Sequence, residues 1–224
     1  MASVLDRIVG PRVPVEEWRG RPGRYALPTL ALSAARVLLI VSLFLPYWHM
    51  TLEAPQYPDG LSVTAFVNHL TGDVKEIDGL NHYIGMRPLH EAAQFERTAS
   101  VWVIIAMVLL VEGAAAVHSK WAVVLVLPAV LFPVGFVADL YYWLSNFGQN
   151  LDPKAPLSSS VKPFTPTIFG PGGIGQFKTY SWAGLGLWFA CGSSVLAVVS
   201  LVFHRRAYKA LFDRAMAQEA SCAS

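Results

Sequence analysis

The chain has 224 residues, of which 54% are hydrophobic and only 14% charged, and its formal net charge is +2. Soluble domains carry roughly 25% charged residues, so this composition with its long apolar runs excludes an ordinary soluble protein and predicts an integral membrane protein. The small net charge gives no reason to expect a nucleic-acid partner. The two cysteines form no CxxC or CxxCH motif, which excludes ordinary covalent haem attachment and CxxC-type metal or redox sites.

Four apolar segments each have about the 20 residues that cross a hydrocarbon core of ~30 Å. We therefore predict a mainly α protein with four transmembrane helices and a small outer, periplasmic loop domain that contains a β-hairpin. The predicted spans are residues 26–48, 98–117, 121–144 and 182–203. The segments that flank or connect them are residues 1–25, 49–97, 118–120, 145–181 and 204–224.

The distribution of Lys and Arg predicts the orientation. These residues gather in the two tails and the short turn at residues 118–120, which the positive-inside rule places in the cytoplasm. Residues 49–97 then lie outside and carry seven acidic residues against three basic ones, whereas three of the four charges in residues 145–181 are lysines. No signal peptide pattern precedes the first span, so we expect it to remain as an anchor. The predicted location is a bacterial inner membrane, with both termini cytoplasmic.

Two charged residues lie well inside the predicted spans. Arg36 is about twelve residues from the outer end of the first span, and Glu112 is about fourteen from the outer end of the second. At 1.5 Å per residue, their depths agree within a few ångström. An unpaired charge at that depth is costly, so we predict an ion pair. Such a pair either holds the register of two helices or serves a proton path or partner contact.

The outer segments contain several local patterns. Residues 61–69 alternate between apolar and polar, which predicts a half-buried strand, and residues 71–73 predict a turn into a short returning strand at residues 74–77. The motif EIDGLNHYIGM follows at residues 76–86. Residues 145–181 are rich in Pro, Ser and Gly but lack the Gly-Lys-Ser/Thr ending of a phosphate loop. We expect them to form an ordered loop that covers the first outer segment, not a nucleotide site.

Histidine and methionine side chains in the first outer segment suggest a metal. His82 and Met86 are four residues apart, a spacing that shares one face of a helical turn, and His49 and Met50 adjoin the first span. Imidazole and thioether ligands together favour copper, especially Cu(I). The candidate ligands are His49, Met50, His82 and Met86, with His69 and His90 as weaker candidates.

A structural interpretation of the same motif competes with the metal. Met86 would then pack the hairpin against the helices, and Asn81, Tyr83 and Gly85 would form a turn held by hydrogen bonds. No serine lies in a nucleophile elbow, and no carboxylate pair accompanies a histidine base, so we do not expect an enzyme.

Three segments carry a resemblance to a known group of proteins. They read WHMTL at residues 48–52, APQYPDGL at 54–61 and GLNHYIGM at 79–86. Over these roughly forty positions, the chain resembles small bacterial membrane proteins that accompany the accessory genes of nitrous oxide reductase, a periplasmic copper enzyme. The resemblance implies a role in copper delivery or enzyme maturation and directs attention to the four candidate ligands.

Two functions therefore remain open. The first is a non-catalytic membrane accessory protein that handles copper or assists the assembly of a periplasmic redox enzyme. The alternative is a structural or docking subunit of a larger respiratory or photosynthetic membrane complex, whose outer loops contact a cytochrome or another redox partner. A transporter has the least support, because the four spans show neither internal repeats nor paired broken helices.

Overall fold

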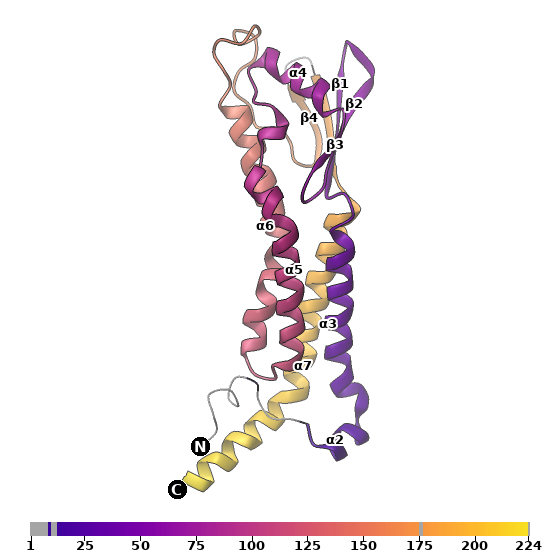
Figure 1. Ribbon diagram of the computed structural model, residues 1–224, viewed down its shortest axis with the longest axis vertical. Helices are drawn as coiled ribbons and strands as arrows, with labels where there is room; N and C mark the ends of the chain where they lie inside the picture. Colours follow the sequence, from indigo (N-terminus) through magenta and orange to yellow (C-terminus); the bar gives the residue numbers. More distant parts are fainter. Residues whose placement is uncertain (1–8, 10–12, 175–176, 224) are drawn as a thin grey trace. The chain divides into compact units, whose positions relative to one another are not determined.

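The computed structural model describes residues 9, 13–174 and 177–223 (Figure 1). The chain is mainly α-helical and has one small antiparallel sheet. It divides into two compact units. The helical unit comprises the chain up to Ile40, Ile104–Phe132 and the chain from Ala190 onward, and the sheet unit comprises Val41–Val103 and Pro133–Phe189.

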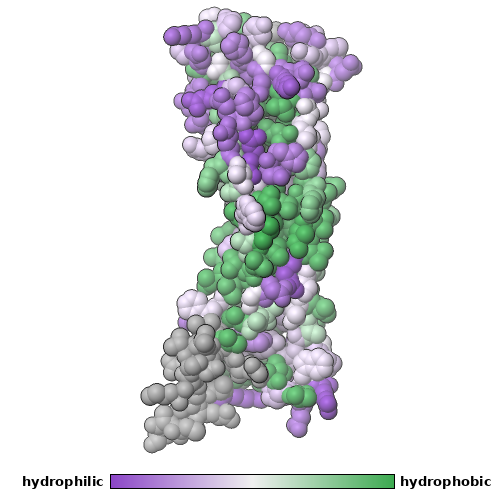
Figure 2. All heavy atoms as spheres, viewed as in Figure 1, coloured by the Kyte–Doolittle hydropathy of each residue, from purple (hydrophilic) through white to green (hydrophobic). Residues whose placement is uncertain are grey.

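Four long helices are apolar enough to cross a membrane, which makes the chain a multi-pass membrane protein. They are α3 (Pro22–Ser42), α5 (Gln94–Ala116), α6 (Trp121–Gln149) and α7 (Leu185–Ala223), and the short helix α2 (Val15–Gly20) precedes them. In Figure 2 the surface of the helical segments is mainly hydrophobic, whereas that of the sheet segments is largely hydrophilic. Apolar side chains therefore face outward where lipid would surround the chain.

Serine hydroxyls join the helices of the helical unit. In α7, buried Ser193 donates a hydrogen bond of 2.8 Å to the carbonyl oxygen of Ala35, and buried Ser200 donates one of 2.7 Å to that of Pro28. Ser194 donates to the carbonyl oxygen of Ala129 in α6 at 3.1 Å. Small residues let helices approach closely, and hydroxyl-to-carbonyl bonds hold them in an apolar surrounding. Helix α7 is thereby bound to both α3 and α6.

The sheet is built from two segments: the one that connects α3 to α5 and the one that connects α6 to α7. Its five antiparallel strands lie in the order β3-β2-β1-β5-β4. They are β1 (Trp48–Ala54), β2 (Tyr57–Ala65), β3 (Leu70–Gly72), β4 (Gly170–Ile174) and β5 (Phe177–Ala183). Strands β1 and β5 pair at the centre, from Trp48 opposite Ala183 to Glu53 opposite Lys178.

One face of the sheet is buried and the other is exposed. Successive residues of a strand point to opposite faces, and in β1 Trp48, Met50 and Leu52 all face the core. Ile77 from helix α4 (Val74–Ile84) and Phe147 from the end of α6 complete this core. The same alternation sends the remaining side chains of the central strands to the exposed face.

The structure corrects the predicted returning strand at residues 74–77, which instead opens helix α4. The spacing of the buried residues Ile77, Asn81 and Ile84 is helical, and a window of four residues was too short to show it. Strand β2 forms one hairpin with β1, through Pro55 and Gln56, and a second hairpin with β3. The predicted strand at residues 61–69 therefore ends at Ala65, and the predicted turn at residues 71–73 overlaps β3.

Residues 145–181 were predicted to be a covering loop, but they supply β4 and most of β5 to the same sheet. Two predicted span ends also belong to strands. Helix α3 ends at Ser42, and Trp48 begins β1; Trp182 lies in β5 and pairs with His49. Hydropathy alone extended the spans through these aromatic residues, because strand pairing between distant segments leaves no local signal.

Candidate functional site: the exposed face of the sheet

The motif at residues 76–86 is held by hydrogen bonds to the segment between α6 and α7. Gly85 ends α4 in the left-handed conformation, with φ of 81°. Its carbonyl oxygen accepts a hydrogen bond of 2.7 Å from the amide of Asp152, and that of Tyr83 accepts one of 3.0 Å from Leu157. The amide of Met86 donates back to the carbonyl oxygen of Asn81 at 2.9 Å. This part of the motif joins the segment between α3 and α5 to the segment between α6 and α7.

Asp78 orders the chain that follows the motif. Its carboxylate accepts a hydrogen bond of 2.6 Å from the amide of Leu89, at the start of the short helix η1 (Leu89–Glu91). The other carboxylate oxygen lies 3.0 Å from Nδ1 of His90. Several residues of the motif therefore have a structural role, because they form hydrogen bonds that hold neighbouring segments. The side chains of His82 and Tyr83 are exposed on α4.

The four candidate copper ligands do not converge. Met50 and Met86 are buried in the apolar core of the sheet unit, with 8% and 7% exposure. His49 follows the opposite alternation on β1, and His82 is exposed on α4. Helix α4 ends before Met86, so the four-residue spacing does not place Met86 on the helical face of His82. These residues do not fit a single copper site.

Two of the candidate histidines, His49 and His69, have other partners. Nδ1 of His49 lies 3.0 Å from the hydroxyl of Thr64, and burial lowers the pKa of His49. His69 stacks on Phe66 and contacts the amide oxygen of Asn68. Within the described ranges, no three His, Cys, Asp or Glu side chains are grouped closely enough to hold a metal ion.

The exposed face of the sheet carries a group of aromatic side chains that we call the aromatic face, formed by His49, Tyr180 and Trp182. Tyr180 is 57% exposed and Trp182 42% exposed, although both lie on β5, which pairs with β1 on one side and β4 on the other. Their ring centroids are 5.8 Å apart, and the ring of His49 stacks on Trp182 at 5.4 Å and 19°. A rigid sheet thus presents adjoining rings to the surroundings.

The sequence interpretation missed the aromatic face because Trp182 was assigned to the start of a span. A signal was nevertheless available. From Phe177 to Trp182, residues alternate between buried and exposed, with Lys178, Tyr180 and Trp182 all on the exposed side. That period of two is the pattern of a half-buried strand, and it marks the large residues that do not serve the core.

The helical unit contains an ion pair between Arg36 of α3 and Glu112 of α5. The guanidinium also donates a hydrogen bond of 2.6 Å to the hydroxyl of Ser33. The side chain of Arg36 is 17% exposed, whereas that of Glu112 is 61% exposed on a helix whose surface is otherwise apolar. The carboxylate of Glu112 is therefore both paired with Arg36 and largely exposed on the helix surface.

Comparison with protein-family models and with curated proteins finds no match for this chain.

Proposed function

We propose that this chain is a non-catalytic membrane subunit that docks a redox protein through the aromatic face. The observation that supports this most is the exposure of Tyr180 and Trp182 on an inner strand of the sheet. The solvated face of an antiparallel sheet is usually polar, so two large exposed rings on a strand that is paired on both sides are unusual. Trp and Tyr are also the residues that most often dominate the energy of protein interfaces.

The position of the basic residues supports a periplasmic partner. The Lys and Arg of both tails and of the turn after α5 favour a cytoplasmic side for these segments, and we infer from this that the sheet unit lies outside a bacterial inner membrane. The resemblance of residues 48–86 to proteins that accompany nitrous oxide reductase genes supports a periplasmic redox enzyme, or its assembly system, as the partner.

The exposed carboxylate of Glu112 favours a second contact, within the bilayer, as expected of a subunit in a larger respiratory or photosynthetic complex. Ionisable groups inside membranes face protein or water far more often than lipid. A neighbouring helix that offers a hydrogen-bond donor would cover this carboxylate. The two contacts are compatible, because one uses the sheet unit and the other uses the helical unit.

A photoreactive amino acid placed at Tyr180 of the full chain, in its native membrane, tests the docking proposal. Irradiation should yield one discrete protein adduct that mass spectrometry identifies as a redox protein or its assembly factor. The same probe at Tyr83, which is 55% exposed on α4, is the matched control in the sheet unit and should not give that adduct. Adducts with lipid alone at Tyr180 would contradict the proposal.

A second comparison separates docking from membrane anchoring, since aromatic residues also gather at membrane interfaces. Trp182→Ser should abolish the adduct formed at Tyr180, whereas Trp102→Ser should preserve it, because Trp102 is 72% exposed on the apolar surface of α5. Equal loss in both variants would show that these residues serve as anchors and not as a docking surface.

A further inference from the structure

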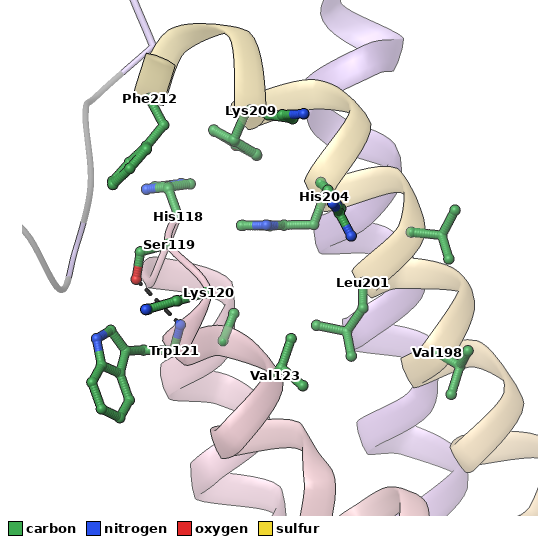
Figure 3. Close-up of a pocket in the computed structure, with 14 residues that line it drawn as sticks. His118, Ser119, Lys120, Trp121, Val123, Val198, Leu201, His204, Lys209 and Phe212 are labelled. Carbon is green, nitrogen blue, oxygen red and sulfur yellow. Dashed lines mark hydrogen bonds between the residues drawn. The ribbon is translucent and has the colours of Figure 1, made fainter. Parts of the chain in front are cut away.

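A pocket of about 700 Å³ lies in the helical unit, between α7 and the turn that joins α5 to α6 (Figure 3). Its apolar side is formed in part by Val123 and Val198, both exposed on the surface of spanning helices. Its polar side carries Lys120, Arg205 and Lys209, and none of the described residues that line it is acidic. The pocket thus combines a hydrophobic wall with concentrated positive charge.

Two histidines that point into this pocket have nitrogens without partners. His204 is only 7% exposed, and neither its Nε2 nor Nδ1 of His118 has a hydrogen-bond partner in the described part of the chain. The two rings stack at 5.6 Å and 7°, and Tyr208 contacts both. Figure 3 shows His118 and His204 projecting from different segments into the pocket. A buried polar atom without a partner is costly, so these nitrogens favour a ligand with oxygen atoms.

We propose that this pocket binds an anionic phospholipid from the adjacent leaflet. The phosphate oxygens accept hydrogen bonds from Lys120, Lys209 and the buried imidazole of His204, and an acyl chain lies along Val123 and Val198. The apolar wall belongs to the lipid-facing surface of spanning helices, which favours a lipid over a water-soluble anion. Basic pockets between membrane helices bind lipid headgroups in this way. The inference is independent of the docking proposal, because every residue in it belongs to the helical unit.

The test uses the purified full-length chain in lipid nanodiscs made of phosphatidylcholine alone or with a minority of phosphatidylglycerol. Native mass spectrometry measures the lipids retained, and thermal unfolding reports the stabilisation by each lipid. Phosphatidylglycerol should be retained preferentially by the wild-type chain. In the double variant Lys120→Gln/Lys209→Gln, the preference should fall about thirtyfold, as expected for the loss of two basic groups at a membrane surface.

Two further variants make the result specific. Arg19→Gln/Arg206→Gln removes the same charge from exposed positions outside this pocket and should retain the preference. His204→Phe retains a buried ring but removes the unpartnered nitrogen, so it should reduce phosphatidylglycerol retention while leaving the unfolding midpoint in phosphatidylcholine unchanged or higher. Unaltered preference in the Lys120→Gln/Lys209→Gln variant would overturn the proposal, as would equal losses in this variant and the Arg19→Gln/Arg206→Gln control. Full competition by soluble glycerol phosphate would show a site for free anions instead.

Discussion

The backbone amide of Asp152 donates a hydrogen bond of 2.7 Å to the carbonyl oxygen of Gly85, and this contact joins the two segments that build the sheet unit. The approach is so close that a Cβ atom at Gly85 would lie 2.6 Å from the carbonyl oxygen of Asp152. Gly85 also has a φ of 81°, a conformation that residues with a side chain rarely adopt. The motif of residues 76–86 therefore has a clear structural role.

Replacing Gly85 by Ala should destabilise the protein, because both the backbone conformation and the contact with Asp152 become strained. We expect a loss of about 2 kcal/mol or more, or a fall of roughly 5 °C in the unfolding midpoint of the purified protein. Gly79→Ala is the control in the same helix, since nothing lies within 4 Å of its added Cβ. That variant should be neutral or stabilising by up to ~1 kcal/mol. Equal losses in the two variants would contradict the role of the Gly85 contact.

Substitutions at Met86 separate core packing from copper ligation. Met86 is buried in the apolar core of the sheet unit, so Met86→Ala should cost about 2–4 kcal/mol and Met86→Leu less than ~1.5 kcal/mol. The copper interpretation predicts instead that Met86→Leu, which lacks the thioether ligand, loses bound metal. Thermal unfolding and elemental analysis of the same preparations compare these predictions. Copper that is bound by the wild-type chain and lost in both Met86→Leu and His82→Ala would support ligation over packing.

The stability of the sheet unit should decrease at mildly acidic pH because of His49. Burial lowers the pKa of His49 from its ordinary value of 6.5, so the folded state favours the neutral ring. The unfolded chain then binds more protons, and the stability that depends on neutral His49 is complete above about pH 6.5 and is lost as the pH falls toward the lower folded-state pKa. Unfolding midpoints measured between about pH 8 and pH 5 should show this decline.

The control for this pH dependence is a pair of single substitutions. His49→Gln should flatten the curve, whereas His82→Gln, at an exposed position on α4, should follow the wild-type curve. An unchanged slope in His49→Gln would assign the decline to other groups.

Neutralising either member of the Arg36–Glu112 pair should be worse than neutralising both. A single substitution leaves a lone charge on an apolar spanning helix, whereas the double variant leaves none. Glu112→Gln should be the more harmful single change, because a lone glutamate can bind a proton while arginine remains charged. The yield of monodisperse protein after extraction, measured for both single variants and the double variant, tests this order. If the double variant lost as much yield as the two single variants together, the two groups would act independently.

Local composition was sufficient to predict the four spanning helices, because an apolar run of about 20 residues has few alternatives to a membrane helix. The similar depths of Arg36 and Glu112 also pointed to the ion pair that the structure contains. Predictions of secondary structure from short windows of four to nine residues were less accurate. The segment at residues 74–77 was assigned to a strand, although the spacing of Ile77, Asn81 and Ile84 belongs to a helix.

The pairing of β1 with β5 could be seen only in the tertiary structure. Their pairing brings His49 beside Trp182, although two membrane-spanning helices separate them in the sequence. Hydrogen bonds between such distant strands leave no local pattern, whereas hydropathy accumulates along a continuous segment. The amino-acid order therefore determined that four segments form helices apolar enough to span a membrane, and strand pairing decided that Met50 and Met86 face a core while Tyr180 and Trp182 form an exposed aromatic face.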